Sequence, residues 1–568
     1  MLGNGTYDGV MPSGGPALRA VVAAVRARAS PSVADDGARQ KGATLPAVTV
    51  RRVDRMVLAV ALVALAYLFY LQTMLASRVI DGTRYFWLDD DMMISMRYGR
   101  NLAEGHGLAW NPGDRVEGYT NFLWTIVMAG VHLTGVSDAH AAALVRVVNY
   151  VLLGGCFGLS LQLLRIFAPR PRLASLLLVA CMFMCPDVVL WSAWGFEASL
   201  LTFLSLVFLV RFLKHGPEPL GLGALALIPL TRGDGVYVYA AYGLCALYMT
   251  SRRRATLGWL ALALLPTVGH FVFRRLYYGD WLPNTYYLKV YGLEAVRARG
   301  WAYGRAFLLD YRLLLALALG SALLVVRRDR RGIVPFVMVP ATVAYVLTTG
   351  GDMYGFFRFF AHLMPVLFVF ATAGLATVVR GKVAQVVWAV IVFVVAVPLL
   401  DPFKRLLSRA TNGDPDRQIQ VAMIVKKNAL PDSKTAVFCA GIVPYFSRLP
   451  VIDILGKSDR HIAHLKAFPG SMIGHGKVDP DYTLGQDPDL VVTCGTNLGQ
   501  AERVAPGAQT YDPMVRFVSA ASFKSRYLTH PIIESYLLLE TAVYTHADSK
   551  EASRRTWAKT IEVGPPPF

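Results

Sequence analysis

Three consecutive carboxylates, Asp89, Asp90 and Asp91, follow Trp87 and Leu88 just after the first long apolar segment. Carboxylates beside a membrane are costly unless they are hydrated or have a function. Because like charges this close cannot all ionise easily, one of the three is expected to have a raised pKa, suited to accepting a proton. Taken alone, the triplet is also typical of a solvated acidic turn. The residues that accompany it favour general-base chemistry.

Acidic, basic and aromatic residues recur together at the ends of later apolar segments. Polar groups at the membrane edge of many separate spans indicate a shared cavity. With the triplet, the residues expected to face it are Glu197, Arg232, Asp234, Asp280, Lys289, Asp352 and Arg358. The cations there could hold a phosphate leaving group while one carboxylate takes the proton of an acceptor hydroxyl.

Each of these residues also has a structural explanation. Arg232 and Arg358 could extend to the membrane interface or pair with a nearby aspartate. Lys289 could be a solvated loop lysine, and Glu197 could stabilise the N-terminus of the helix that follows it. The functional explanation is favoured because all of them are expected on one side of the membrane.

The composition is that of a membrane protein. The chain has 568 residues, 55% of them hydrophobic and 17% charged, with a mean hydropathy of +0.43. Apolar runs of roughly 17–25 residues recur along it, and only closed helices satisfy the backbone in lipid. The net charge of +19 does not indicate nucleic-acid binding, because the basic residues fall in short clusters between apolar runs and no binding motif accompanies them.

The distribution of charge predicts eleven membrane-spanning helices. They are expected at about 56–76, 140–166, 173–190, 198–213, 219–230, 236–250, 256–273, 311–326, 333–349, 360–379 and 383–400. With this arrangement every dense basic cluster lies on the cytoplasmic side and every motif that mixes acid, aromatic and glycine lies on the other. Phe122–Leu133 is too short to span and is expected to lie against the membrane surface, within a long outer loop at about 80–138.

Three regions are predicted along the chain. Residues 1–50 have no sustained apolar period and indicate a disordered, basic cytoplasmic tail. Residues 51–400 form the transmembrane region. Residues 401–568 are more polar and indicate a small α/β domain on the outer face, with strands at Thr435–Ala440 and Leu490–Cys494 and a helix at Gln418–Asn428.

Two further sets of residues were considered. Cys156, Cys181, Cys185 and Cys245 lie in apolar runs and are expected in the core, whereas Cys439 and Cys494 could form a disulfide if their region is outside the cytosol. The outer region also holds five candidate ligands or catalytic groups, but no metal-ligand spacing joins them, so structural roles are favoured. They are Asp453, Asp459, His461, His464 and His475.

The same motifs carry a family resemblance. The chain resembles GT-C-type integral membrane glycosyltransferases, and more narrowly the arabinofuranosyltransferases that add terminal β-1,2-linked arabinofuranose to the mycobacterial cell wall, with the related bacterial proteins that modify pilins. The matching stretches are Trp87–Arg97 with Arg100–Leu102, Asn111–Glu117 with Thr120 and Trp124, Gly195–Glu197, Leu230–Arg232, Tyr277–Gly279 through Pro283, Thr285 and Lys289, and Gly350–Met353 with Arg358.

The resemblance implies a polyprenyl-phosphate sugar donor, with D-arabinofuranose on decaprenyl phosphate as the favoured one. It implies a single inverting displacement onto an envelope glycan, lipid or protein acceptor at a periplasmic site of the bacterial inner membrane. The family's aspartate pair matches Asp90 and Asp91, either of which could be the base, and Asp89 makes this assignment ambiguous by one position. No cofactor is implied with certainty, although the acidic cluster could hold a divalent metal ion.

The resemblance also implies roles for the other motif residues. Arg232, Lys289 and Arg358 would neutralise the departing phosphate, and Glu197 and Asp352 would orient hydroxyl groups. Arg97 and Glu117 also count as substrate-binding residues because they stand in matching motifs. One departure is Gly233, where relatives often have proline.

Three other functions stay open from the sequence. The first keeps the class and changes the donor to a hexose or an aminoarabinose, with lipid A, glycan or protein as acceptor. The second is a transporter of a lipid-linked substrate, which predicts internal repeats that this sequence lacks. The third is a non-catalytic assembly or sensor protein, in which Asp90→Asn would leave function intact.

Overall fold

The computed structural model of the chain describes residues 47–168, 172–327, 329–378, 381–396, 414–468, 471, 473–493, 513–526, 543–545 and 563. The chain divides into two units, 1–50 and 51–568, and nearly all described residues belong to the second. The predicted tail lies outside the described residues as far as residue 46. Residues 47–50 differ from the prediction because they begin the first helix.

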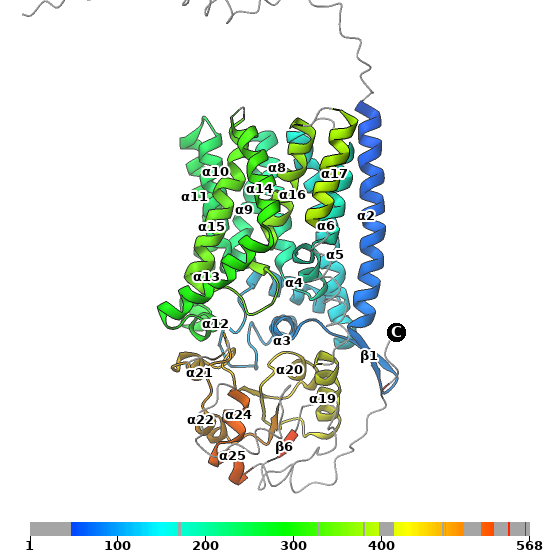
Figure 1. Ribbon diagram of the computed structural model, residues 1–568. Helices are drawn as coiled ribbons and strands as arrows, with labels where there is room; N and C mark the ends of the chain where they lie inside the picture. The colour runs from blue at the N-terminus through cyan, green and yellow to red at the C-terminus, as the bar shows by residue number, and fades with distance from the viewer. Residues whose placement is uncertain are drawn as a thin grey trace, which may run out of the picture. The chain divides into compact units, whose positions relative to one another are not determined.

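Long apolar helices make up most of the second unit (Figure 1). They are α2 (Ala47–Leu75), α5 (Asp138–Phe167), α6 (Arg172–Met184), α7 (Pro186–Ala193), α8 (Ala198–His215), α9 (Pro219–Thr231), α10 (Gly235–Met249), α11 (Arg253–Tyr278), α13 (Leu293–Asp310), α14 (Arg312–Val326), α15 (Val334–Thr349), α16 (Met364–Val378) and α17 (Lys382–Ala396). A helix therefore stands at each predicted span. The helix α13 was not predicted, and it meets α14 at a bend of 75°.

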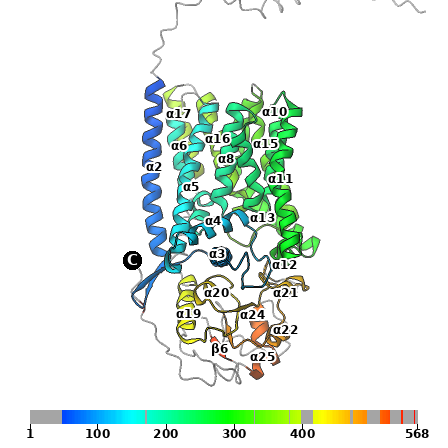
Figure 2. The same ribbon diagram turned by 180° about the vertical axis from the view of Figure 1, so that it is seen from behind.

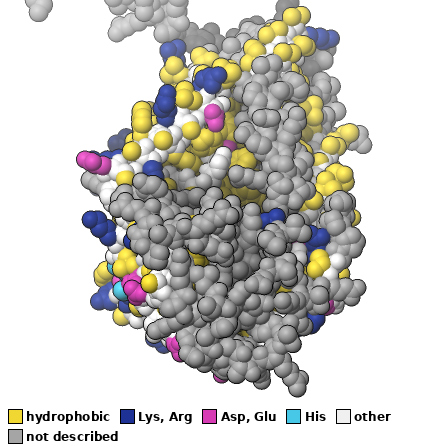
Figure 3. All heavy atoms as spheres, turned by 60° about the horizontal axis from the view of Figure 1, so that its bottom comes forward, with side chains coloured by type: hydrophobic (Ala, Val, Ile, Leu, Met, Phe, Trp, Pro, Cys, Tyr) yellow, Lys and Arg dark blue, Asp and Glu magenta, His cyan; other side chains and the backbone are white. Residues whose placement is uncertain are grey.

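Among the described residues, five helices are long and apolar enough to cross a membrane, or up to seven if each bent pair is one span. Five further apolar helices are shorter, so the count of eleven spans stays a prediction. Large hydrophobic side chains face outward on these helices, for example Val63 at 71% and Leu276 at 80% exposure. Figure 3 shows hydrophobic side chains spread over the helical region, with Lys and Arg side chains along the upper edge of the view and further charged groups lower down. This surface is typical of a multi-pass membrane protein.

The segment between α2 and α5 folds into a hairpin and two helices. Strands β1 (Ser77–Ile80) and β2 (Thr83–Phe86) pair antiparallel around Asp81 and Gly82. Both turn residues have positive φ, at 47° and 78°, as a two-residue hairpin loop of this kind requires. The helices are α3 (Asp90–Ala103) and α4 (Phe122–Leu133), and α4 has the predicted bounds. The hairpin thus leads the chain from α2 directly to the acidic triplet.

The C-terminal part contains a four-stranded sheet in the order β4-β3-β5-β6. Its strands are β3 (Thr435–Val437), β4 (Val451–Asp453), β5 (Leu490–Val492) and β6 (Val543–Thr545), with β3 parallel to β4 and β5, and β6 antiparallel. Its helices are α19 (Asp414–Asn428), α20 (Ile442–Ser447), α21 (Arg460–His464), α22 (Pro480–Gly485), α24 (Pro513–Val518) and α25 (Ala521–Arg526). β3, β4 and β5 are buried throughout, as parallel strands require, and both predicted strands are present.

Two helices of the C-terminal part pack directly on the membrane-associated segments. Helix α20 contacts α3, and α21 contacts α12 (Asn284–Lys289). Both views of the ribbon place α20 beside α3 (Figure 2). Loops of the C-terminal part are thereby brought close to the acidic triplet.

The cysteines agree in part with expectation. Those of the helical region, Cys156, Cys181, Cys185 and Cys245, are free and buried. Cys439 is disulfide-bonded. Cys494 lies outside the described residues, so its pairing with Cys439 stays a prediction.

Candidate active site

The acidic triplet forms the N-terminus of α3. Asp89 is the N-cap residue, and its Oδ1 accepts a hydrogen bond of 3.1 Å from the backbone N–H of Asp91. The N–H of Asp89 in turn donates to the carbonyl oxygen of Trp194, at 3.0 Å. Side-chain capping and the helix dipole both stabilise negative charge here. The chain therefore fixes three carboxylates at one helix end.

Asp91 is held between a lysine and a tyrosine from distant segments. The Nζ atom of Lys457 lies 2.6 Å from Oδ1 of Asp91, and the hydroxyl of Tyr354 lies 3.4 Å from Oδ2. The same hydroxyl donates to Oδ1 of Asp89 at 2.8 Å. Tyr354 thus links the first and third carboxylates of the triplet.

Asp90 points toward the C-terminal part instead. Its Oδ1 accepts a hydrogen bond of 2.8 Å from the N–H of Ile442, at the start of α20. A side chain at Gly441 would collide with the backbone carbonyl oxygen of Asp90, so glycine permits this close approach. Of the two aspartates favoured from the sequence, Asp90 is therefore the one engaged by the backbone.

Arg358 lies in an aromatic enclosure beside the triplet. It forms an ion pair with Asp352, with Nε 2.8 Å from Oδ2. Its guanidinium lies 4.7 Å from the ring centre of Phe196 and 5.3 Å from that of Tyr354, within the range of cation–π attraction. The ring of Tyr354 packs edge-on against Trp191 at 5.7 Å. Arg358 begins the short helix η2 (Arg358–Leu363).

Lys289 has no ion-pair partner among the described residues. It is the last residue of α12 and is half-buried. Its electrostatic neighbours are Asp91, Arg358, Asp352 and Lys457, yet it makes no hydrogen bond or ion pair with any described residue. A half-buried ammonium group of this kind is suited to binding an anion.

Arg232, Glu197 and Asp234 form a second polar cluster, buried behind Arg358. Nε of Arg232 lies 2.8 Å from Asp234 Oδ1 and 3.4 Å from Glu197 Oε1. The second oxygen of Glu197 accepts from Asn121 at 3.1 Å, and Asn121 accepts from Ser95 of α3 at 2.8 Å. Nη1 of Arg232 is buried and has no partner. The cluster is thus tied to α3 and retains one free donor.

The surroundings shift the pKa values of the three aspartates in different directions. Burial and the neighbouring Asp91 raise the pKa of Asp89 to about 7. Burial would also raise the pKa of Asp91, but Lys457 and then Lys289 outweigh it, so that pKa lies below its usual range. At Asp90, burial raises the pKa and outweighs the opposite effect of Lys457. At Lys289, burial lowers the pKa of the ammonium group. Asp91 is therefore the carboxylate of the triplet whose surroundings favour the ionised form.

Two residues that were predicted to bind substrate are instead bonded within the protein. Arg97 is 2% exposed, and Nε donates to the carbonyl of Trp110 at 2.7 Å. Its other nitrogens donate to Pro444, Leu449 and Asn111. This geometry fits a residue that joins α3 to the C-terminal part.

Glu117 forms a buried bidentate ion pair with Arg274 of α11, with N–O distances of 2.6 and 3.0 Å. Its backbone carbonyl also accepts from the N–H of Asn284, at 2.9 Å, and so anchors the start of α12. Both side-chain oxygens are occupied, which indicates a structural role. The remaining predicted residues, Glu197, Arg232, Lys289, Asp352 and Arg358, do lie in or beside the site.

Lys457 was not predicted to belong to the site. It stands in a polar stretch, Gly456 to Ser458, and no spacing in the chain relates it to the triplet. Tyr354 directly follows the Gly350–Met353 motif and was not among the predicted site residues. Their roles depend on tertiary contacts between segments more than 250 residues apart.

Most of the polar candidates in the C-terminal part have the structural roles that were favoured. Asp459 caps α21 through the N–H of Ile462, at 3.0 Å. His461 contacts Asp479 at 2.9 Å, and His464 contacts the carbonyl of Arg460 at 2.8 Å. His475 differs, because Lys457, Asp91 and Lys289 all act on it, and burial first and then Lys457 lower its pKa to about 4.

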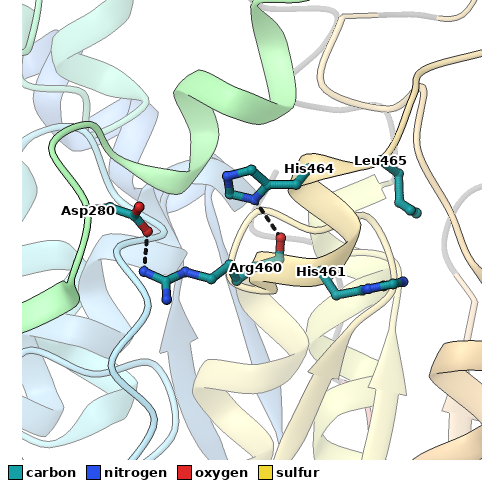
Figure 4. A pocket seen from close by; sticks show the side chains of 5 residues that line it. All are labelled: Asp280, Arg460, His461, His464 and Leu465. Carbon is teal, nitrogen blue, oxygen red and sulfur yellow. Dashed lines mark hydrogen bonds and ion pairs between the residues drawn. The ribbon is translucent and has the colours of Figure 1, made fainter.

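A cleft of about 470 Å³ opens where the loop before α12 meets α21. It is lined by Asp280, Arg460, His461, His464 and Leu465. Figure 4 shows Asp280 facing the guanidinium of Arg460, with which it forms an ion pair. Asp280 thus lies in this cleft rather than with the triplet. The cleft adjoins the site through α12, which begins four residues after Asp280 and ends at Lys289.

A metal ion has no evident binding group in the part of the chain that the structure describes. There, no three histidine, cysteine, aspartate or glutamate side chains are arranged to hold one. Within the triplet, Asp91 faces Lys457 and Asp90 faces a backbone N–H, so their oxygens are directed to other partners. No step below therefore depends on a metal.

The arrangement of the helices resembles that of a membrane protein of known structure. The crystal structure of ArnT from Cupriavidus metallidurans bound to undecaprenyl phosphate aligns with a TM-score of 0.53, at 12% sequence identity, over 88% of this chain and 99% of that chain. At this level of identity the likeness concerns the fold.

Two curated relatives are more similar in sequence. Both are terminal β-(1→2)-arabinofuranosyltransferases. The one from Mycobacterium tuberculosis is 29% identical over 305 residues, covering 46% of this chain and 47% of the relative. The one from Corynebacterium glutamicum is 28% identical over 329 residues, covering 49% and 47%. The chain thus spans about half the length of the curated relatives it matches.

The C-terminal part has a separate match. Residues 410–541 match a family described as a domain of unknown function, DUF8728. This range includes α20, the strands β3 to β5 and Lys457.

Proposed function

We propose that the chain is a polyprenyl-phosphate-dependent glycosyltransferase that transfers D-arabinofuranose to an acceptor hydroxyl. The observation that carries the proposal is the position of Asp91, an ionised carboxylate that faces the cations Lys289, Lys457 and Arg358. A general base and an anion site are thereby combined in one place. This combination is what transfer from a lipid phosphate to a hydroxyl needs.

The donor phosphate would bind at Lys289 and Arg358. Lys289 has no counter-ion among the described residues, and Arg358 has only Asp352 as an ion-pair partner. The free Nη1 donor of Arg232 lies in the buried cluster behind them. Charge-assisted hydrogen bonds from ammonium and guanidinium groups stabilise a departing phosphate.

The reaction proposed is a single displacement. The acceptor oxygen forms a bond to the anomeric carbon as the bond from that carbon to the phosphate oxygen breaks, and the electron pair leaves with the lipid phosphate. Asp91 takes the acceptor proton. A bound phosphate offsets the cations that keep Asp91 ionised, and so makes it a stronger base when the donor is present. Asp89 is the alternative base, because a pKa of about 7 suits proton transfer near neutral pH.

The comparisons support the proposed sugar and lipid carrier. The curated relatives are arabinofuranosyltransferases, which supports arabinofuranose, and ArnT binds undecaprenyl phosphate, which supports a polyprenyl carrier. We place the site on the periplasmic face of a bacterial inner membrane, with eleven spans and the C-terminal region outside. The acceptor is an envelope glycan, lipid or protein.

The test is a donor comparison with purified protein in detergent or nanodiscs. Radiolabelled arabinofuranose, mannose, glucose and aminoarabinose are each presented on a synthetic polyprenyl phosphate, with a short arabinan acceptor. Transfer of arabinofuranose supports the proposal, and transfer of another sugar alone would keep the class and refute the arabinose. Absence of transfer from every donor, with folded protein and several acceptors, would contradict the enzyme.

A further inference from the structure

The nearest cation to the triplet comes from the region of unknown function at 410–541. Nζ of Lys457 lies 2.6 Å from Oδ1 of Asp91, and Lys457 is 7% exposed. It is the one ion-pair partner of Asp91 among the described residues. Asp90 is also contacted by this region, through the N–H of Ile442. Two of the three carboxylates are thus bonded to the same C-terminal part.

The loop that carries Lys457 is stabilised by hydrogen bonds to Asp453, the last residue of β4. Asp453 is 1% exposed, and it accepts hydrogen bonds from the N–H groups of Leu455 at 3.0 Å, Gly456 at 3.1 Å and Ser458 at 2.6 Å. Gly456 has a φ of +79°, which glycine tolerates best. A buried carboxylate that accepts hydrogen bonds from three backbone N–H groups of one loop fixes the shape of that loop.

The same loop is also hydrogen-bonded to α12, in the helical region. The side-chain amide of Asn284, at the start of α12, donates to the carbonyls of Gly456 at 2.9 Å, Lys457 at 3.2 Å and Asp459 at 3.0 Å. Asn284 is 5% exposed. Two buried polar residues from different parts of the chain therefore fix one lysine against one aspartate.

The charges around Asp91 show what Lys457 contributes. From α3 come Asp89 and Asp90, from α12 comes Lys289, from residues 352–358 come Asp352, Tyr354 and Arg358, and from the C-terminal part come Lys457 and His475. Of these groups, only Lys457 forms an ion pair with Asp91. Its removal would leave Asp91 beside two other carboxylates without a bonded counter-ion.

We propose that Lys457 is a positioning residue of the active site, which orients Asp91 and keeps it ionised, so that the 410–541 region completes the catalytic centre. The inference rests on the proposed function and deepens it. In this proposal the 410–541 region supplies the positive charge of Lys457 next to Asp91, the base on α3.

The experiment compares Lys457→Met, Lys457→Arg and Lys466→Met in the full-length protein. Lys466 is an exposed lysine nearby and serves as the matched control. We measure kcat and KM for donor and acceptor between pH 4 and 9. Lys457→Met is expected to lower kcat about 100-fold near pH 6, because Asp91 loses its orientation, and to raise the acidic limb of the profile by about one unit or more, from below pH 4 in wild type toward the measured range. Lys457→Arg restores most of that shift, and Lys466→Met matches wild type.

A structural role alone would lower the melting temperature without moving the acidic limb, and that result overturns the proposal. Infrared titration gives a readout that needs no turnover, using the carboxyl band that disappears in Asp91→Asn. Its midpoint is expected to rise in Lys457→Met, and an unchanged midpoint contradicts the inference. Failure of the proposed function is recognised separately, because wild type would then transfer no sugar while this midpoint still responds.

Discussion

Arg146 of α5 donates a hydrogen bond of 2.7 Å from Nη2 to the carbonyl oxygen of Trp87, two residues before the acidic triplet. Its Nε donates to the carbonyl of Ala193, at 2.9 Å, just before the loop that leads to Glu197. Arg146 is 1% exposed, and it has no carboxylate partner among the described residues. It therefore joins the two loops that carry the first acidic motif and the Glu197 motif.

We expect Arg146→Met to destabilise the protein by about 2–4 kcal/mol, because two buried carbonyls lose their donor. Since the loops would lose their alignment, kcat is expected to fall more than donor KM rises. Thermal unfolding in detergent and steady-state kinetics check this. Equal stability with unchanged kcat would show that the two loops are aligned by other contacts.

The three aspartates are expected to respond differently to replacement by asparagine. Asp91→Asn should lose activity by about 1000-fold or more, because it removes the proposed base. Asp90→Asn should retain most activity, because an amide oxygen still accepts from the N–H of Ile442. Single-turnover transfer with equal amounts of folded protein checks this order. Loss confined to Asp89→Asn would move the base to Asp89.

Asp89 should make stability depend on pH. Its pKa of about 7 in the folded protein lies above the unfolded value of about 3.9. The stability that comes from its bound proton is complete below about pH 4 and is lost as the pH rises through 7. Asp89→Asn should therefore match wild type near pH 4 and exceed it by about 1–2 kcal/mol at pH 8, allowing for partial solvent screening. Denaturant unfolding at both pH values measures this, and a difference that does not change with pH would contradict it.

Variants of the ion pair between Glu117 and Arg274 test whether Glu117 has a structural role or the predicted substrate-binding role. Breaking a buried bidentate pair leaves one charge unpaired, so Glu117→Gln should cost about 3–5 kcal/mol. The double variant Glu117→Gln with Arg274→Met should recover part of that loss, and donor KM per folded molecule should stay near wild type. A double-mutant cycle by thermal unfolding checks the coupling. A large rise in donor KM in folded Glu117→Gln would restore the substrate-binding role.

Local patterns in the sequence predicted much of the fold and half of the site. Apolar length and basic clusters marked a helix at every proposed span, and the α4 boundaries emerged from a short apolar run. Motif type singled out the triplet, Lys289, Asp352 and Arg358. The sequence does not distinguish an arginine that binds substrate from one that joins segments. The substrate-binding role of Arg97 stays a prediction, and its hydrogen bonds join α3 to the C-terminal part.

The unpredicted features come from long-range contacts. Lys457 reaches Asp91 across 366 positions, and Asn284 fixes its loop across more than 170. Neither pairing leaves a periodic or spaced pattern in the chain. Helix α13 was missed for a local reason, because the charged residues within Leu293–Asp310 leave no long apolar run.

The central claim is that Asp91 accepts the proton of the acceptor during transfer of arabinofuranose from a polyprenyl phosphate. The most direct measurement is the rate of label transfer by purified wild type and Asp91→Asn, after both are shown to be folded and to bind the donor equally. We predict transfer by wild type and a loss of about 1000-fold or more in the variant, at unchanged donor affinity. Equal rates in the two proteins would contradict the claim.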